Sequence, residues 1–82
     1  MNIYIANISF RASETDLKNL FSKYGEVSSA KIITDRETGK SRGFGFVEMP
    51  QASEGTAAIA DLNGQEFQGR ELVVNEARPQ SK

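Results

Sequence analysis

The stretch RGFGFVEM at residues 42–49 constrains the fold of this 82-residue chain more than any other. In a β-strand, alternate side chains point to opposite faces, so the stretch divides into two rows. One row is small and apolar, as expected for a face packed against helices, and consists of Gly43, Gly45, Val47 and Met49. The other row places two phenylalanines between charged residues, and consists of Arg42, Phe44, Phe46 and Glu48. Because the half-exposed face of a sheet is normally polar, bare rings there indicate a surface for a flat, unpaired ring such as a nucleobase, beside a cation suited to phosphate.

The composition excludes several kinds of chemistry. The chain has no cysteine, and therefore neither a disulfide nor a thiolate site. It also has no histidine, which is the commonest metal ligand and the commonest general base near neutral pH. We therefore expect a protein that is not an enzyme and that holds neither a metal nor a cofactor. The sequence shows no membrane span and no signal peptide, so we expect a cytoplasmic location, or a nuclear one in a eukaryotic source.

The charge balance limits how the chain could bind nucleic acid. Its formal net charge is −1, with ten basic residues against eleven acidic ones. A basic footprint is the usual electrostatic sign of a nucleic-acid-binding protein. Any such site here must therefore be a local arrangement in which stacking contributes more than bulk attraction.

Hydrophobic periodicity predicts the first elements of the fold. Residues 2–6 are expected to form a strand with isoleucines on the core face and Tyr4 on the opposite face. In the loop that follows, we expect Ile8 and Phe10 to anchor the chain in the core.

A helix is expected to begin near Ser13, because serine is a favourable N-cap and acidic residues follow it. The apolar stripe of this helix is Leu17, Leu20, Phe21 and Tyr24. Gly25 is expected to be the left-handed residue just after the helix ends.

The next elements are a strand and a hairpin loop. Residues 27–34 are expected to form a strand that carries Lys31 and Ile33 on the same face as the phenylalanines. The polar, glycine-containing segment at residues 35–41 is expected to form the loop into the next strand.

The last third of the chain is predicted to supply a helix, a small hairpin and a strand. The helix is expected over residues 52–62, with a buried stripe of Ala58, Ile59 and Leu62. Gly55 inside it costs about 1 kcal/mol relative to alanine unless it permits close packing on the sheet. A small hairpin is expected around Phe67, and the last strand over residues 70–75. In that strand Leu72 and Val74 are expected to face inward, and Val73 and Asn75 outward.

The element order is therefore strand, helix, strand, strand, helix, strand. Two helices can cover only one face of a four-stranded sheet, so the opposite face is expected to stay open.

Residues 42–49 resemble the second signature of the RNA recognition motif (RRM) family, K/R-G-F/Y-G/A-F-V-x-F/Y. They match it at every specified position except the last, where Met49 replaces an aromatic residue and is expected to point inward. Residues 3–8 resemble the family's first signature, with Ala6 where glycine is usual. The resemblance covers residues 2–78. The chain is similar to small stand-alone bacterial single-RRM proteins and to the RRM of plant glycine-rich RNA-binding proteins.

The resemblance implies an α+β fold of the ferredoxin-like βαββαβ type. Its four-stranded antiparallel sheet would have the order 4-1-3-2, with both helices on one face. The domain is expected to span residues 1–78, followed by a short polar tail at residues 79–82. The implied function is binding of single-stranded RNA across the open face by a monomer, in post-transcriptional regulation or as an RNA chaperone. Single-stranded DNA is a second candidate ligand, because stacking does not need a 2′-hydroxyl group.

The resemblance also implies roles for single residues. Tyr4 and Phe46 would stack on bases, and Phe44 would lie against the sugars between them. Arg42 would contact phosphate.

Further residues are implied around these rings. Asn75 and Arg78 would read base edges. The border of the surface would be formed by Lys31, Ile33 and Val73. Glu48 lies on the same face and has two open interpretations: it discourages phosphate there, or it forms a cross-strand pair with Lys31.

Two other classes of function remain as alternatives. Some RRM domains bind proteins, and the negative net charge slightly favours a protein-interaction module. Small ferredoxin-like folds also include acyl-phosphate hydrolases, which need a loop of backbone amides aimed at an anion. The loop at residues 7–12 contains Arg11 but lacks the glycines that such a loop requires.

Overall fold

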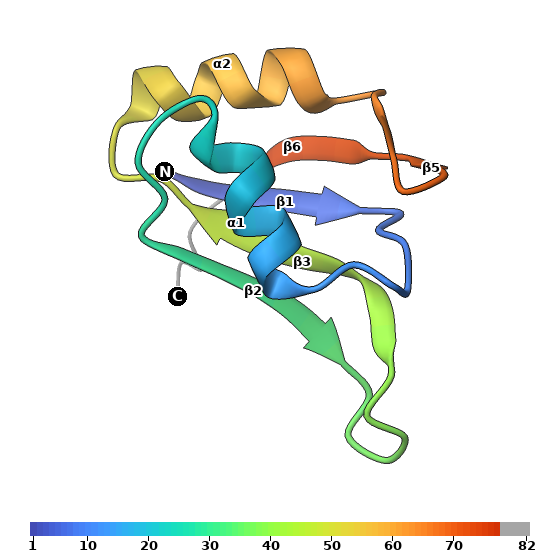
Figure 1. Ribbon diagram of the computed structural model, residues 1–82. Helices are drawn as coiled ribbons and strands as arrows, with labels where there is room; N and C mark the ends of the chain where they lie inside the picture. Colours follow the sequence, from blue (N-terminus) through green and yellow to red (C-terminus); the bar gives the residue numbers. More distant parts are fainter. Residues whose placement is uncertain (78–82) are drawn as a thin grey trace.

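The computed structural model describes residues 1–77 (Figure 1). Its elements are β1 (Asn2–Ala6), α1 (Glu14–Ser22), β2 (Ser29–Thr34), β3 (Ser41–Glu48), α2 (Ala52–Leu62), β4 (Glu66–Phe67), β5 (Arg70–Glu71) and β6 (Val73–Ala77). Four of the strands form one antiparallel sheet in the order β2-β3-β1-β6, and β4 and β5 form a separate hairpin. The predicted ferredoxin-like α+β fold and its strand order are therefore confirmed, with β6 as the fourth strand.

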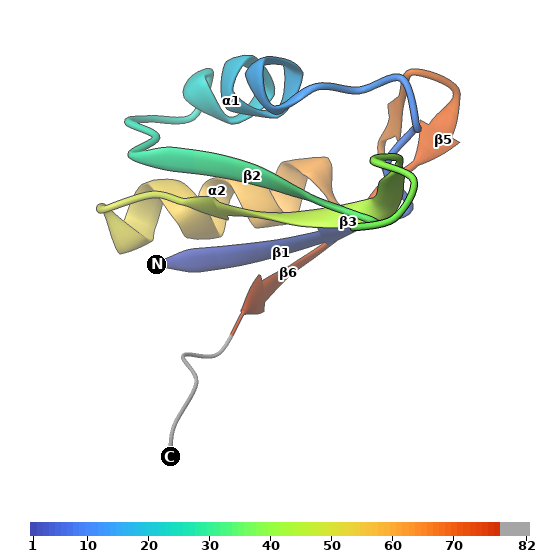
Figure 2. The ribbon, with the colours of Figure 1, turned by 90° about the horizontal axis from the view of Figure 1, so that it is seen from below.

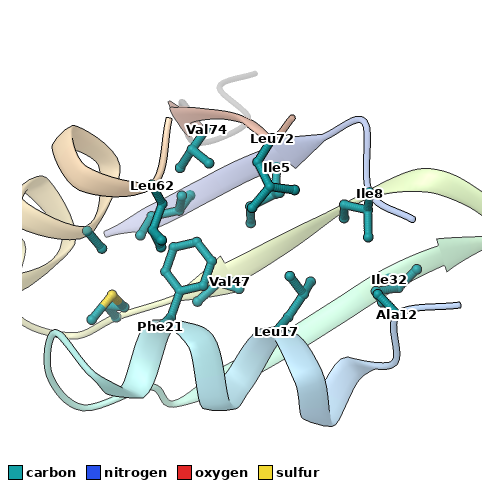
Figure 3. Close-up of a cluster of buried hydrophobic side chains, with 13 residues drawn as sticks. Ile5, Ile8, Ala12, Leu17, Phe21, Ile32, Val47, Leu62, Leu72 and Val74 are labelled. Atoms are coloured by element: carbon teal, nitrogen blue, oxygen red, sulfur yellow. The ribbon is translucent and has the colours of Figure 1, made fainter. Parts of the chain in front are cut away.

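The two helices cover one face of the sheet between them. Helix α1 lies over β2 and β3 (Figure 2), and α2 lies over β6 and β1 (Figure 1). The core fills the space between the layers: Phe21 and Leu17 of α1 and Leu62 of α2 point toward sheet residues such as Ile5, Val47 and Val74 (Figure 3). Met49 is also fully buried, as its position in the alternating pattern predicts.

Helix α1 starts where the sequence predicts. The Ser13 hydroxyl accepts a hydrogen bond from the Asp16 amide at 3.1 Å, and the Asp16 carboxylate accepts one from the Ser13 amide at 3.0 Å, which completes a capping box. The prediction for its end is wrong, because Lys23 is the C-cap and Gly25 lies two residues beyond it. Neither described helix is long and apolar enough to cross a membrane.

Helix α2 spans the predicted residues, and its glycine is explained by close packing. Gly55 is buried, and a Cβ atom there would overlap the Met1 sulfur and approach Ile3. Ala58 and Leu62 are buried as expected, whereas Ile59 is only half-buried.

The predicted boundary of the last strand is wrong. Residues Arg70–Glu71 form β5 and pair with β4, which confirms the small hairpin around Phe67. The Leu72 amide donates to the Gln65 carbonyl, and the Leu72 carbonyl accepts from the Gly64 amide, both at 2.8 Å. Because these bonds tie Leu72 to the segment after α2, pairing with β1 begins only at Val73 and continues to Ala77. Strand β2 likewise begins at Ser29, two residues later than predicted.

Candidate nucleic-acid interface

Four predicted site residues form one line across the open face of the sheet. In the strand register, Phe46 of β3 lies opposite Lys31 of β2 and opposite Tyr4 of β1, and Tyr4 lies opposite Asn75 of β6. Residues directly opposite each other in neighbouring strands share a face. The structure therefore brings these side chains together, although they are far apart in the sequence.

Three aromatic rings meet on this face, and we call Tyr4, Phe44 and Phe46 the aromatic platform. The Tyr4 ring centroid lies 5.6 Å from that of Phe46 and 6.1 Å from that of Phe44, with the planes tilted by 55° and 42°. These distances are typical of favourable aromatic pairs. Phe46 is 38% exposed, and the other two rings are half-buried. The rings therefore pack as tilted pairs and still present surface to solvent.

A second row of side chains runs beside the first and has a small residue, Ala6, at its centre. Ala6 of β1 lies opposite Phe44 on one side and opposite Val73 on the other. Val73 is 41% exposed at the outer end of this row, and its role as a border of the platform stays a prediction. Ile33 is half-buried and falls where the β2–β3 register shifts between Ile32 and Thr34.

The charged residues on the face are spread out. Glu48 lies opposite Ser29 and Asn2, whereas Lys31 lies opposite Phe46, so a directly opposed pair of Glu48 and Lys31 does not form. The other interpretation of Glu48, that its charge discourages phosphate at that end of the sheet face, stays a prediction. Arg78, the second predicted base reader, lies outside the described residues.

The loop between β2 and β3 is held by an aspartate beside the predicted phosphate contact. One carboxylate oxygen of Asp35 accepts hydrogen bonds from the amides of Glu37 and Thr38 at 2.8 and 3.3 Å. These bonds lower the pKa of Asp35, and the positive charge of Arg42 lowers it further. Arg42 is exposed near the start of β3, where its charge acts on Asp35.

The structure corrects the prediction for Phe10, which is 67% exposed and does not anchor the core, whereas Ile8 is buried. Asn7 has a φ of 59°, so the alternation of β1 stops there. The Ala12 amide then donates to the Ser9 carbonyl at 3.0 Å, which closes a turn with Phe10 on its outside. The sequence signal for this end of the alternation is the asparagine itself, because asparagine tolerates the left-handed conformation better than most residues.

The exposed Phe10 ring belongs to a second feature, which we call the lateral hollow. This depression of about 310 Å³ adjoins the platform and is lined by Tyr4, Ala6, Asn7, Ile8, Phe10, Arg42, Gly43, Phe44 and Arg70. The Arg70 guanidinium carbon lies 5.6 Å from the centre of the Phe10 ring. Sequence reasoning missed both residues, since it placed Phe10 in the core and Arg70 in the last strand.

The described residues 1–77 contain no group of three or more acidic side chains placed to hold a metal ion. A four-stranded antiparallel sheet with βαββαβ order, two helices on one face and an aromatic row on the other defines an RRM-type fold. Residues 3–73 match the family described as RNA recognition motif, and the chain belongs to that family.

Individual proteins resemble the chain over nearly all of its length. RbpD of Nostoc sp. is 53% identical over 79 residues, which are 96% of this chain and 84% of that protein. The crystal structure of RNA Binding Protein PG1 is 54% identical, with a TM-score of 0.95, and the match covers 100% of this chain and 99% of that one. The structure of the Rna15 RRM with bound RNA (GU) is 28% identical, with a TM-score of 0.83, over 93% of this chain and 81% of that one.

Proposed function

We propose that this protein is a non-catalytic module that binds single-stranded RNA across the open face of its sheet. The observation that carries the proposal is the line Lys31–Phe46–Tyr4–Asn75, in which an exposed and a half-buried ring lie between a cation and an amide. Membership of the RNA recognition motif family supports it. So do the name of PG1, RNA Binding Protein, and the RNA bound in the Rna15 structure.

In this proposal the platform supplies most of the affinity. Tyr4 and Phe46 each stack on one base, and Phe44 lies against the sugars between them. Each stacked base contributes about 1–3 kcal/mol by alanine substitution. Stacking tolerates any base and any sugar, so single-stranded DNA is expected to compete with RNA on the same surface.

Polar groups at the edges of the platform fix the position of the RNA strand and add some selectivity between bases. Arg42 contacts a phosphate from the start of β3. The Asn75 side-chain amide both donates and accepts hydrogen bonds, so it can read the edge of the base that stacks beside it on Tyr4. The sides of the RNA-binding surface are bordered by Lys31, Ile33 and Val73. With few phosphate contacts, binding is expected to be modest in strength.

The test is an NMR titration of the uniformly labelled protein with short single-stranded RNA from a random pool. We expect amide shifts on β1 and β3 and at Asn75, with little change along α1 and α2. Shifts confined to the helices, or none at all, would contradict the proposal and favour the alternative of a protein-interaction module. The cytoplasmic location, the monomeric state and the role in post-transcriptional regulation or RNA chaperoning stay predictions.

A further inference from the structure

We propose that the lateral hollow is a third nucleotide subsite, in which a base stacks on Phe10 and the adjoining phosphate is contacted by Arg42 and Arg70. This proposal rests on the proposed function, because it extends the track of the same RNA beyond the aromatic platform. It assigns a binding role to two residues that lie outside the sheet signatures, in the β1–α1 loop and in β5.

Phe10 has the features of a stacking surface. Its side chain is 67% exposed, more than the Phe46 ring at 38%. The Arg70 guanidinium lies over the ring within cation–π distance, and Phe10 still stays largely exposed. Single-stranded nucleotides are commonly bound by stacking on aromatic rings and on arginine planes, and this pair offers both.

The pair is held in place before any ligand binds. The Asn7 side-chain amide donates to the Glu71 carbonyl at 2.7 Å, and its oxygen accepts from Arg70 Nε at 3.2 Å. Arg70 is thereby oriented through one of its five N–H donors, so its terminal amino groups remain for a phosphate. A side chain ordered in the free protein loses less conformational entropy on binding.

The position and charge of the hollow also suit a nucleotide. Tyr4 and Phe44 line it together with Phe10, so an RNA strand that leaves the platform enters it directly. Two arginines line it and no acidic residue does, in a chain whose net charge is −1. Its volume of about 310 Å³ lies at the small end of the range of ligand sites.

The β1–α1 loop, the β2–β3 loop and the β4–β5 hairpin all lie at the same end of the sheet (Figures 1 and 2). The hollow therefore opens at one end of the aromatic track and away from the Glu48 end. RNA that occupies both features must be longer than RNA that occupies the platform alone, and this difference makes the subsite testable.

The test compares Phe10→Leu, Phe10→Trp and Arg70→Gln with the unchanged protein by fluorescence anisotropy. Two labelled RNAs are used. The short one spans only the platform, and the long one carries extra nucleotides at both ends so that one end reaches the hollow. For the extended RNA we expect Phe10→Leu to weaken binding by about 5-fold to 140-fold, the range of one stacked base. Phe10→Trp, which keeps a flat ring, is expected to bind the extended RNA as tightly as the unchanged protein does. Arg70→Gln is expected to reduce the slope of log affinity against log salt by about 0.7, the value of one lost phosphate contact.

Phe46→Leu, measured with the same RNAs, separates this proposal from the proposed function. If Phe46→Leu weakens binding and Phe10→Leu does not, the subsite is overturned and the platform stands. If neither variant weakens binding, the platform itself is wrong. An equal loss for short and extended RNA in Phe10→Leu, or no recovery in Phe10→Trp at an unchanged melting temperature, would also overturn the subsite. Because Phe10 is largely exposed, both of its variants are expected to fold.

Discussion

Replacing Phe46 by leucine is the most direct test of the aromatic platform. Leucine keeps an apolar side chain on β3 and removes the flat ring. The ring now lies 5.6 Å from Tyr4, and such a pair contributes about 0.5–1.5 kcal/mol beyond its buried area. We therefore expect the free energy of unfolding to fall by about 1 kcal/mol. A domain with a stability of about 5–15 kcal/mol remains folded after that loss.

The loss in binding should be larger than the loss in stability. One stacked base is worth about 1–3 kcal/mol, so the dissociation constant for single-stranded RNA should rise by about 5-fold to 140-fold. The assay is fluorescence anisotropy with a labelled random-sequence RNA. Thermal unfolding followed by circular dichroism shows in parallel that the variant is folded.

Phe67→Leu is the matched control. Phe67 lies in β4, is half-buried against the core, and lines a shallow depression with Leu20 and Lys23 of the α1 region, away from the platform. This variant should lose some stability and bind RNA as before. The reasoning is refuted if both variants weaken binding equally, or if a folded Tyr4→Leu, Phe46→Leu double variant binds as tightly as the unchanged protein.

Three further predictions follow from other parts of the structure. Gly45→Ala should strongly destabilise the protein in urea unfolding, because its Cβ would overlap the Lys31 carbonyl oxygen and force β2 and β3 apart; an unchanged midpoint would contradict this close approach. Arg42→Gln should reduce the salt slope of RNA binding by about 0.7, whereas Lys18→Gln on the exposed side of α1 should leave it unchanged. Hydrogen bonds from the Ser13 amide and then from Gln68 lower the pKa of Asp16 in the folded protein. The stability that this carboxylate contributes is therefore present above the unfolded pKa of about 4 and is lost as the pH falls through the lower folded value. Asp16→Asn should flatten the pH dependence of unfolding in that acidic range, and an unchanged curve would show that the capping box does not titrate as described.

Much of the platform could be predicted from the sequence. The alternation in residues 42–49 placed Phe44 and Phe46 on one face, and the short strand at residues 2–6 placed Tyr4 on the same face. Both predictions hold because the side-chain period of a strand is a property of the chain itself. The outward position of Asn75 was also predicted, although the boundary of its strand was not.

The lateral hollow could not be predicted in the same way. Phe10 follows Ile8 at strand spacing, but the left-handed Asn7 and the turn after it end the alternation. Arg70 reads as part of the last strand until Leu72 is seen to bond to Gln65 and Gly64. Both errors arise at backbone turns, because each turn depends on only a few residues and leaves little signal in the sequence.

By itself the sequence determined which side chains share a face within each strand, where α1 begins, and that the helices leave one side of the sheet uncovered. Only the tertiary structure decided which residues of different strands stand opposite each other, and so placed Tyr4 between Phe46 and Asn75. The reason is physical. Alternation and capping depend on neighbours in the chain, whereas register depends on hydrogen bonds and packing between segments that meet only in the folded protein.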